Sequence, residues 1–107
     1  MEIVFHSHHA AVSDHLRRLA QRGLDRIARR LTRVVSAVVR FEQDGRLRRV
    51  EIVLHAPRNR QLVGEGNGRY FGPALTAALE RVASQTNHVK RPPKQRANRR
   101  VRRVARS

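Results

Sequence analysis

The feature that most constrains the fold is an amphipathic stretch over residues 13–33. Ser13 is a typical helix N-cap, and Asp14 places a carboxylate in the first turn, where the helix dipole favours it. The apolar residues that follow recur at helical spacing and form one stripe of about five turns: Leu16, Leu19, Ala20, Leu24, Ile27, Ala28 and Leu31. The opposite face carries one carboxylate, Asp25, among six arginines: Arg18, Arg22, Arg26, Arg29, Arg30 and Arg33. The stretch therefore predicts a helix with one side packed on a core and the other lined with arginine.

Strand patterns lie on both sides of this helix. Alternating or β-branched apolar residues predict four strands: residues 2–6, 34–42, 47–56 and, as a weaker edge strand, 60–65. In the third of these, Val50, Ile52 and Leu54 share one face. Asp44-Gly45 predicts a two-residue hairpin turn before it, because both central positions of such a turn favour positive φ.

A glycine-rich segment follows the fourth strand. Residues 64–68 predict a break in the sheet and a flexible turn, because the segment lacks the Lys-Ser/Thr pair of a phosphate-binding loop. Gly72-Pro73 then predicts the start of a second helix, with proline at the first helical position. The apolar stripe of this helix consists of Leu75, Ala78, Leu79 and Val82.

These elements occur in the order β-α-β-β-β-α. The first helix crosses between two strands, which should therefore be parallel, and the hairpins add antiparallel strands. We expect an α+β fold in which a four-stranded mixed sheet carries both helices on one face. Residues 1–91 would form this domain, and residues 92–107 a basic tail that is disordered when free.

The charge of the chain indicates a polyanionic partner. The chain has 24 Lys and Arg and eight Asp and Glu, which gives a formal net charge of +16. Only two of the basic residues are lysines, Lys90 and Lys94, and the others are arginines. Such an excess repels itself in the folded state, so it is better explained by nucleic-acid binding than by the fold. Nine basic residues lie within 90–107, where an extension could fold along RNA. Absence of cysteine and of a long apolar run favours a cytoplasmic protein that does not enter the membrane.

Other candidate chemistries are weaker. His6 and His8 would share a strand face, but no carboxylate or cysteine accompanies them at ligand spacing, so we expect no metal site and no cofactor. Ser13, Ser36 and Ser84 have no nucleophile motif around them, which argues against an enzyme with a small-molecule substrate. Tyr70, the only tyrosine, fits two interpretations equally: a ring that stacks on an unpaired base, or a half-buried core residue.

Three stretches carry a resemblance to a known family: EIVFHSHHAAVSDHLRR, RRLTRVVSAVV and GEGNGRYFGPALTAALERV. Over residues 1–91 the chain resembles the ribosome hibernation-promoting factors, also called ribosome-associated inhibitors or sigma-54 modulation proteins, in their short form. The resemblance implies a bacterial stress-response protein that binds the small ribosomal subunit, in the channel of messenger and transfer RNA, and so inhibits translation. The chain departs from the family pattern at Gly68-Arg69, where an acidic residue is usual. Its second helix is also less basic than is usual in the family. We expect a short form, without the dimerisation domain of the longer members.

The basic and aromatic residues on these elements are the predicted contacts to 16S rRNA: Arg18, Arg22, Arg26, Arg29, Arg30, Arg33, Arg69, Tyr70, Arg81, His88, Lys90, Arg91, Lys94, Arg96, Arg99 and Arg100. We expect the free protein to be a monomer. Two other functions remain open, a generic double-stranded-RNA-binding module and a regulator of sigma-54-dependent transcription.

Overall fold

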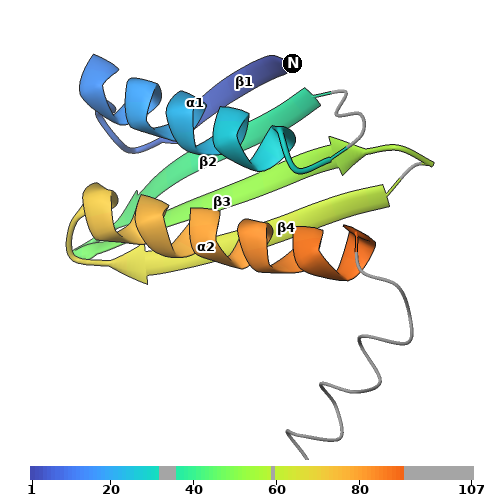
Figure 1. Ribbon diagram of the computed structural model, residues 1–107. Coiled ribbons are helices and arrows are strands. Elements are labelled where there is room, and N and C mark those ends of the chain that lie inside the picture. Colours follow the sequence, from blue (N-terminus) through green and yellow to red (C-terminus); the bar gives the residue numbers. More distant parts are fainter. Residues whose placement is uncertain (32–35, 59, 91–107) are drawn as a thin grey trace, which may run out of the picture.

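The computed structural model describes residues 1–31, 36–58 and 60–90, the side chains of 87–90 excepted. Its elements follow the predicted order: β1 (Glu2–His8), α1 (Asp14–Ala28), β2 (Ser36–Asp44), β3 (Leu47–Ala56), β4 (Arg60–Gly68) and α2 (Phe71–Lys90). The four strands form one sheet in the order β1-β2-β3-β4, with β1 parallel to β2 and the other pairs antiparallel. Both helices cover the same face of the sheet (Figure 1). The predicted α+β fold is therefore confirmed.

The core lies between the helices and the inner face of the sheet. Alternate strand residues point into it, among them Val39, Ile52 and Leu54, which are fully buried. Phe41 lies at its centre: its ring stacks on Phe5 at a centroid distance of 6.5 Å and meets the edge of Phe71 at 5.5 Å. On the helical side, the core includes six residues of α1 and α2: Ala20, Leu24, Ile27, Leu75, Ala78 and Val82.

Helix α1 begins as predicted and ends earlier. The Leu16 N–H donates to the Ser13 hydroxyl at 3.2 Å, which is the expected N-cap. After Ala28 the chain tightens into a turn, in which the N–H groups of Arg30 and Leu31 donate to carbonyls three residues back. The helix is therefore about four turns long rather than five.

The first hairpin turn is displaced by one residue from its predicted position. Asp44 pairs with Leu47, so the two turn residues are Gly45 and Arg46 rather than Asp44 and Gly45. Gly45 has a φ of +61° and occupies the first central position, where type II′ turns place glycine. Strand β3 has its predicted bounds. Strand β2 ends two residues later than predicted, at Asp44, and its predicted first residues, 34–35, lie outside the described residues.

The prediction for the glycine-rich segment is wrong. Residues 64–68 do not break the sheet but form the second half of β4, and Gly64 and Gly66 are buried. A Cβ atom on Gly66 would collide with the Ala74 carbonyl oxygen and lie 2.8 Å from the Ala78 nitrogen. The glycines therefore let the backbone of α2 lie directly on β4 (Figure 1). Their role is close helix–strand packing rather than flexibility.

Helix α2 starts two residues before its predicted position. It begins at Phe71, and Pro73 lies in the first turn, where its missing N–H costs no hydrogen bond. The Ala74 N–H donates to the Tyr70 carbonyl at 3.3 Å and closes that turn. Within the described ranges, neither helix is long and apolar enough to cross a membrane.

Candidate nucleic-acid interface

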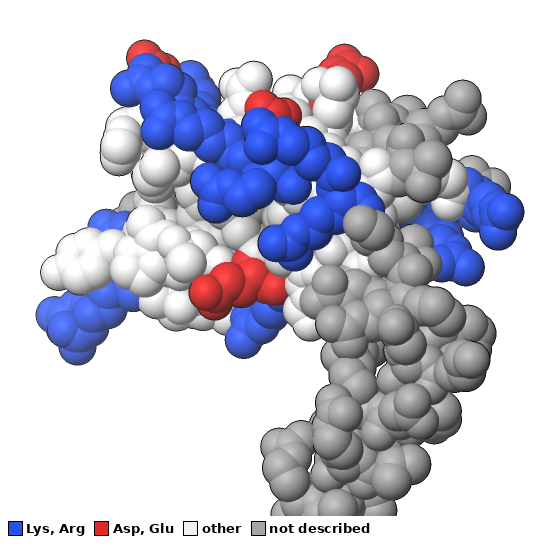
Figure 2. Space-filling model, viewed as in Figure 1, with Lys and Arg blue, Asp and Glu red and all other residues white. Residues whose placement is uncertain are grey.

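The outer face of α1 carries the main cluster of cationic side chains. Arg18, Arg22 and Arg26 are exposed on the helix, and Arg29 and Arg30 are exposed in the turn that follows it. At 3.6 residues per turn, Arg18, Arg22 and Arg29 fall along one line on the helix. Figure 2 shows the resulting blue surface over α1, with acidic atoms only in small separate patches. We call these five residues the α1 arginine face.

These arginines are not neutralised by neighbouring carboxylates. In residues 1–31, 36–58 and 60–86, three ion pairs are present, and the one on α1 joins Arg17 to Asp14 at 3.4 Å. None of the three involves the α1 arginine face. Guanidinium groups without an internal acidic partner keep their donors for phosphate oxygens, which they contact bidentately.

A groove between α1 and α2 adjoins this face. Its floor is apolar, with Ile27 from α1 and Leu75 and Leu79 from α2. Arg26 and Arg30 line the α1 side, and Thr76 and Glu80 the α2 side. The two helices are in close contact at Gly23. A Cβ atom at this position would lie only 2.6 Å from Leu79 Cδ1. Gly23 thus has a packing role that offsets its poor helix propensity. The sequence did not predict the groove, which depends on how the two helices pack.

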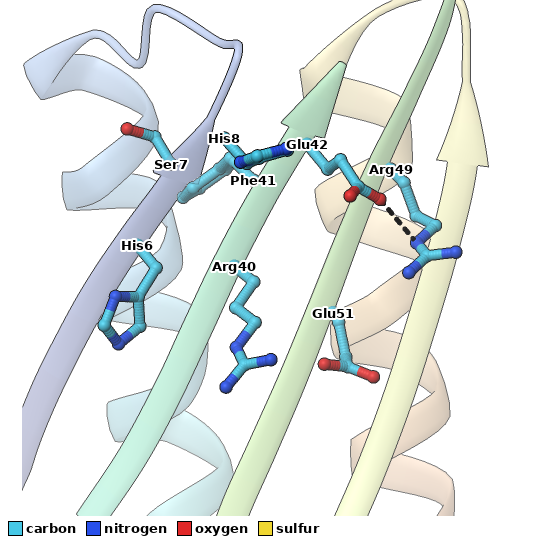
Figure 3. Close-up of a pocket in the computed structure, with 8 residues that line it drawn as sticks. All are labelled: His6, Ser7, His8, Arg40, Phe41, Glu42, Arg49 and Glu51. Atoms are coloured by element: carbon cyan, nitrogen blue, oxygen red, sulfur yellow. Dashed lines mark ion pairs between the residues drawn. The ribbon is translucent and has the colours of Figure 1, made fainter. Parts of the chain in front are cut away.

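The face of the sheet away from the helices has a different charge pattern. His6, Arg40 and Glu51 lie side by side on three neighbouring strands (Figure 3). Arg49 lies between two carboxylates, 3.3 Å from Glu42 and 3.4 Å from Glu65. Cationic groups on this face therefore have acidic neighbours, unlike those of the α1 arginine face.

His6 and His8 share this open face, as predicted. Arg40 is the register partner of His6 on β2, so the neighbouring strand presents a cation there rather than a metal ligand. Across the part of the chain that the structure describes, no group of three or more His, Cys, Asp or Glu is placed to hold a metal ion.

Two polar residues of α2 bond to the edge strand β4: Arg81, a predicted RNA contact, and Gln85, which was not predicted. Arg81 donates a hydrogen bond from its guanidinium to the Glu65 carbonyl. Gln85, one turn further on, bonds the backbone of Val63. Arg81 is exposed and has further N–H donors. It bonds on the side of α2 that faces the edge of β4, whereas α1 lies on the other side of α2 (Figure 1).

Tyr70 and Arg69 lie at the corner between β4 and α2. Tyr70 is 69% exposed, so the interpretation as a half-buried core residue is wrong. The aromatic core position next to it is occupied by Phe71, which is buried. Arg48 of β3 donates to the Arg69 carbonyl at 2.7 Å, a contact that sequence patterns did not reveal because it depends on the β3–β4 register.

The remaining predicted contacts lie outside the residues or side chains that the structure describes: Arg33, His88, Lys90, Arg91, Lys94, Arg96, Arg99 and Arg100. The same holds for the predicted tail, residues 92–107.

Fold and surface together define a small α+β domain with one basic helical face and an opposite face of mixed charge. A profile of the family described as sigma 54 modulation protein / S30EA ribosomal protein matches residues 3–92, and the chain belongs to this family. This confirms the resemblance inferred from the sequence. The family description names a ribosomal protein and a modulation protein rather than an enzyme.

Solved structures share the fold. The N-terminal domain of Protein Y from Thermus thermophilus has a TM-score of 0.74 and 21% identity, over 84% of this chain and 100% of that one. A ribosomal subunit interface protein from Coxiella burnetii has a TM-score of 0.73 and 14% identity, over 84% of this chain and 98% of that one. No curated protein sequence matches the chain.

Proposed function

We propose that this protein is a ribosome hibernation factor, which binds 16S rRNA in the messenger and transfer RNA channel of the small ribosomal subunit and inhibits translation. The observation that carries the proposal is the α1 arginine face, five exposed arginines without an acidic partner among the described residues. Membership of a family that includes an S30EA ribosomal protein supports a ribosomal partner. The likeness in fold to a ribosomal subunit interface protein from Coxiella burnetii agrees with it.

Inhibition in this proposal needs no chemical step. Arginines spaced along a rigid helix meet successive phosphates of an RNA backbone, and the sheet behind α1 holds them in place. A bound domain then occupies space that messenger and transfer RNA require. The fraction of silenced ribosomes follows the ratio of protein concentration to Kd, and the effect reverses on dissociation.

The free protein is proposed to act in the cytoplasm as a monomer. Its formal charge of +16 opposes association between copies. The same charge raises the rate of encounter with rRNA. The predicted contacts of α2 and residues 90–107 would extend the interface beyond α1.

Sucrose-gradient co-sedimentation with purified 30S and 50S subunits and 70S ribosomes tests the proposal, with a translation assay beside it at low and high salt. We expect binding confined to particles that contain 30S, together with inhibited translation. Equal binding to both subunits, lost together as salt rises, would identify a nonspecific polycation and contradict the proposal. Equal affinity for isolated RNA duplexes and 30S would instead identify a generic double-stranded-RNA module.

A further inference from the structure

Among the phenylalanine and tyrosine side chains, all of which lie in the described residues, Tyr70 is the one that the fold leaves in solvent. The residue is 69% exposed, whereas Phe41 and Phe71 are buried and Phe5 is half-buried. An exposed ring of this size contributes nothing to the core. Because aromatic faces stack on nucleic-acid bases, its position on a strongly basic protein points to a role in recognition.

The backbone around Tyr70 is held on both sides. Arg48 donates to the Arg69 carbonyl at 2.7 Å, and its guanidinium carbon lies 5.8 Å from the centroid of the Phe71 ring. The Tyr70 carbonyl accepts the Ala74 N–H at 3.3 Å. The ring is thus presented from a fixed corner, which lowers the ordering entropy that a ligand must offset on binding.

The surroundings of Tyr70 are basic. Arg69 precedes it, and Arg48 is the register partner of Gly68, so the Gly45-Arg46 turn lies at the same end of the sheet (Figure 1). This end of the sheet therefore carries three arginines, Arg46, Arg48 and Arg69, and one carboxylate, Asp44. Such a corner attracts a polyanion rather than a basic or neutral partner.

The groove between the helices connects this corner with the α1 arginine face. Gly72, two residues after Tyr70, lines the groove together with Arg26 and Arg30 of the opposite side. A strand that places a base at Tyr70 can therefore continue along the groove to these two guanidinium groups. Between them the groove is mostly apolar, but Thr76 and Glu80 line its α2 side. The Glu80 carboxylate repels phosphate groups, so this stretch is better suited to a base or a sugar, with the backbone on the arginine side.

We propose that Tyr70 stacks on an unpaired base of a single-stranded RNA segment whose backbone continues along the α1–α2 groove to Arg26 and Arg30. This proposal rests on the proposed function and adds to it the kind of RNA that is recognised. Base–aromatic stacking tolerates any base, so the contact selects unpaired RNA rather than a sequence. A duplex keeps its bases stacked inside and gives Tyr70 no partner.

The sequence supplies a direct probe, because Tyr70 is the only tyrosine and the chain has no tryptophan. Tyrosine emission of the full chain therefore reports on this ring alone. We would titrate it with single-stranded oligouridylate and with a blunt RNA duplex, and measure affinity in parallel from the anisotropy of the same RNAs carrying fluorescein. We expect oligouridylate to quench the emission at saturation, and the duplex to bind with little quenching.

Substitutions separate stacking from charge. Tyr70→Ala should weaken oligouridylate binding about tenfold and leave duplex binding unchanged, while Tyr70→Phe, which keeps the aromatic face, should bind like the wild type. Tight binding of oligouridylate with unquenched emission, or an unaltered affinity of Tyr70→Ala, would overturn this inference and leave the proposed function standing. If oligouridylate does not bind at all, this inference fails, whereas the proposed function is decided separately by co-sedimentation with 30S subunits.

Discussion

The side-chain amide of Gln85 in α2 pairs with both backbone groups of Val63 in β4. The Val63 N–H donates to Gln85 Oε1 at 3.1 Å, and Gln85 Nε2 donates to the Val63 carbonyl at 2.5 Å. Arg81 adds a third bond, to the Glu65 carbonyl. Strand β4 is an edge of the sheet, and unpaired edge groups are a template for association with another chain. The helix therefore occupies bonding positions that a further strand would otherwise use.

Gln85→Ala should lower the free energy of unfolding by about 1–2 kcal/mol, because two hydrogen bonds between α2 and β4 are lost. Urea denaturation measures this change. The variant should also self-associate more readily than the wild type in light scattering, since the β4 edge becomes accessible. Unaltered stability would show that solvent replaces these bonds at no cost.

Gly66→Ala should destabilise the fold by about 1–3 kcal/mol or more, because its methyl group collides with the backbone of α2. Gly72→Ala is the matched control. Beyond its chain neighbours and its own helix backbone, a Cβ at Gly72 meets no atom within 4 Å, so this variant should be about as stable as the wild type. Thermal unfolding compares the two. Equal midpoints for both variants would refute the close packing of β4 against α2.

Arg49→Ala should change little. Its two ion pairs lie on the open sheet face and are about half exposed, and such pairs contribute less than about 1 kcal/mol. Affinity for the small subunit should also stay the same, because two carboxylates already compensate this charge. A marked loss of affinity in a filter-binding assay would place the RNA on the sheet face instead.

Binding to the small subunit should weaken steeply with salt. Each phosphate contact contributes a slope of about −0.7 to −0.9 to log K against log of the salt concentration. Replacing Arg26 and Arg30 by alanine should reduce the magnitude of the slope by about 1.4 to 1.8, as two contacts are lost. Fluorescence anisotropy over a salt series gives both slopes. The same slope for both proteins would exclude these two residues from the interface.

Local patterns in the sequence were enough to predict the element order and the α1 arginine face. The spacing of Leu16, Leu24 and Ile27 is set by the helix period, and it places the arginines on the far side without any tertiary knowledge. The role of Gly66 could not be predicted in this way, because it depends on a helix that packs across the strand. The same limit applies to the turn at Gly45, where strand pairing rather than local preference decides which residues form the loop.

The site was predicted less completely than the fold. The groove between the helices depends on the contact of Gly23 with Leu79, and the support of Tyr70 depends on Arg48 reaching the Arg69 carbonyl. Both contacts join residues that are distant in sequence. Exposure of Tyr70 likewise follows from which of two adjacent rings, Tyr70 or Phe71, enters the core.

Charge-matched variants test the central claim most directly. Arg26→Glu, Arg29→Glu and Arg30→Glu together reverse the α1 arginine face, while Arg40→Glu, Arg58→Glu and Arg60→Glu make the same change in net charge on the sheet face and the β3–β4 turn. Co-sedimentation of both folded triple variants with 30S subunits compares them at one salt concentration. We predict that the first variant stays unbound and that the second pellets with 30S nearly as well as the wild type. Retained binding of the first variant, or equal loss in both, would contradict the account, because binding would then not depend on α1.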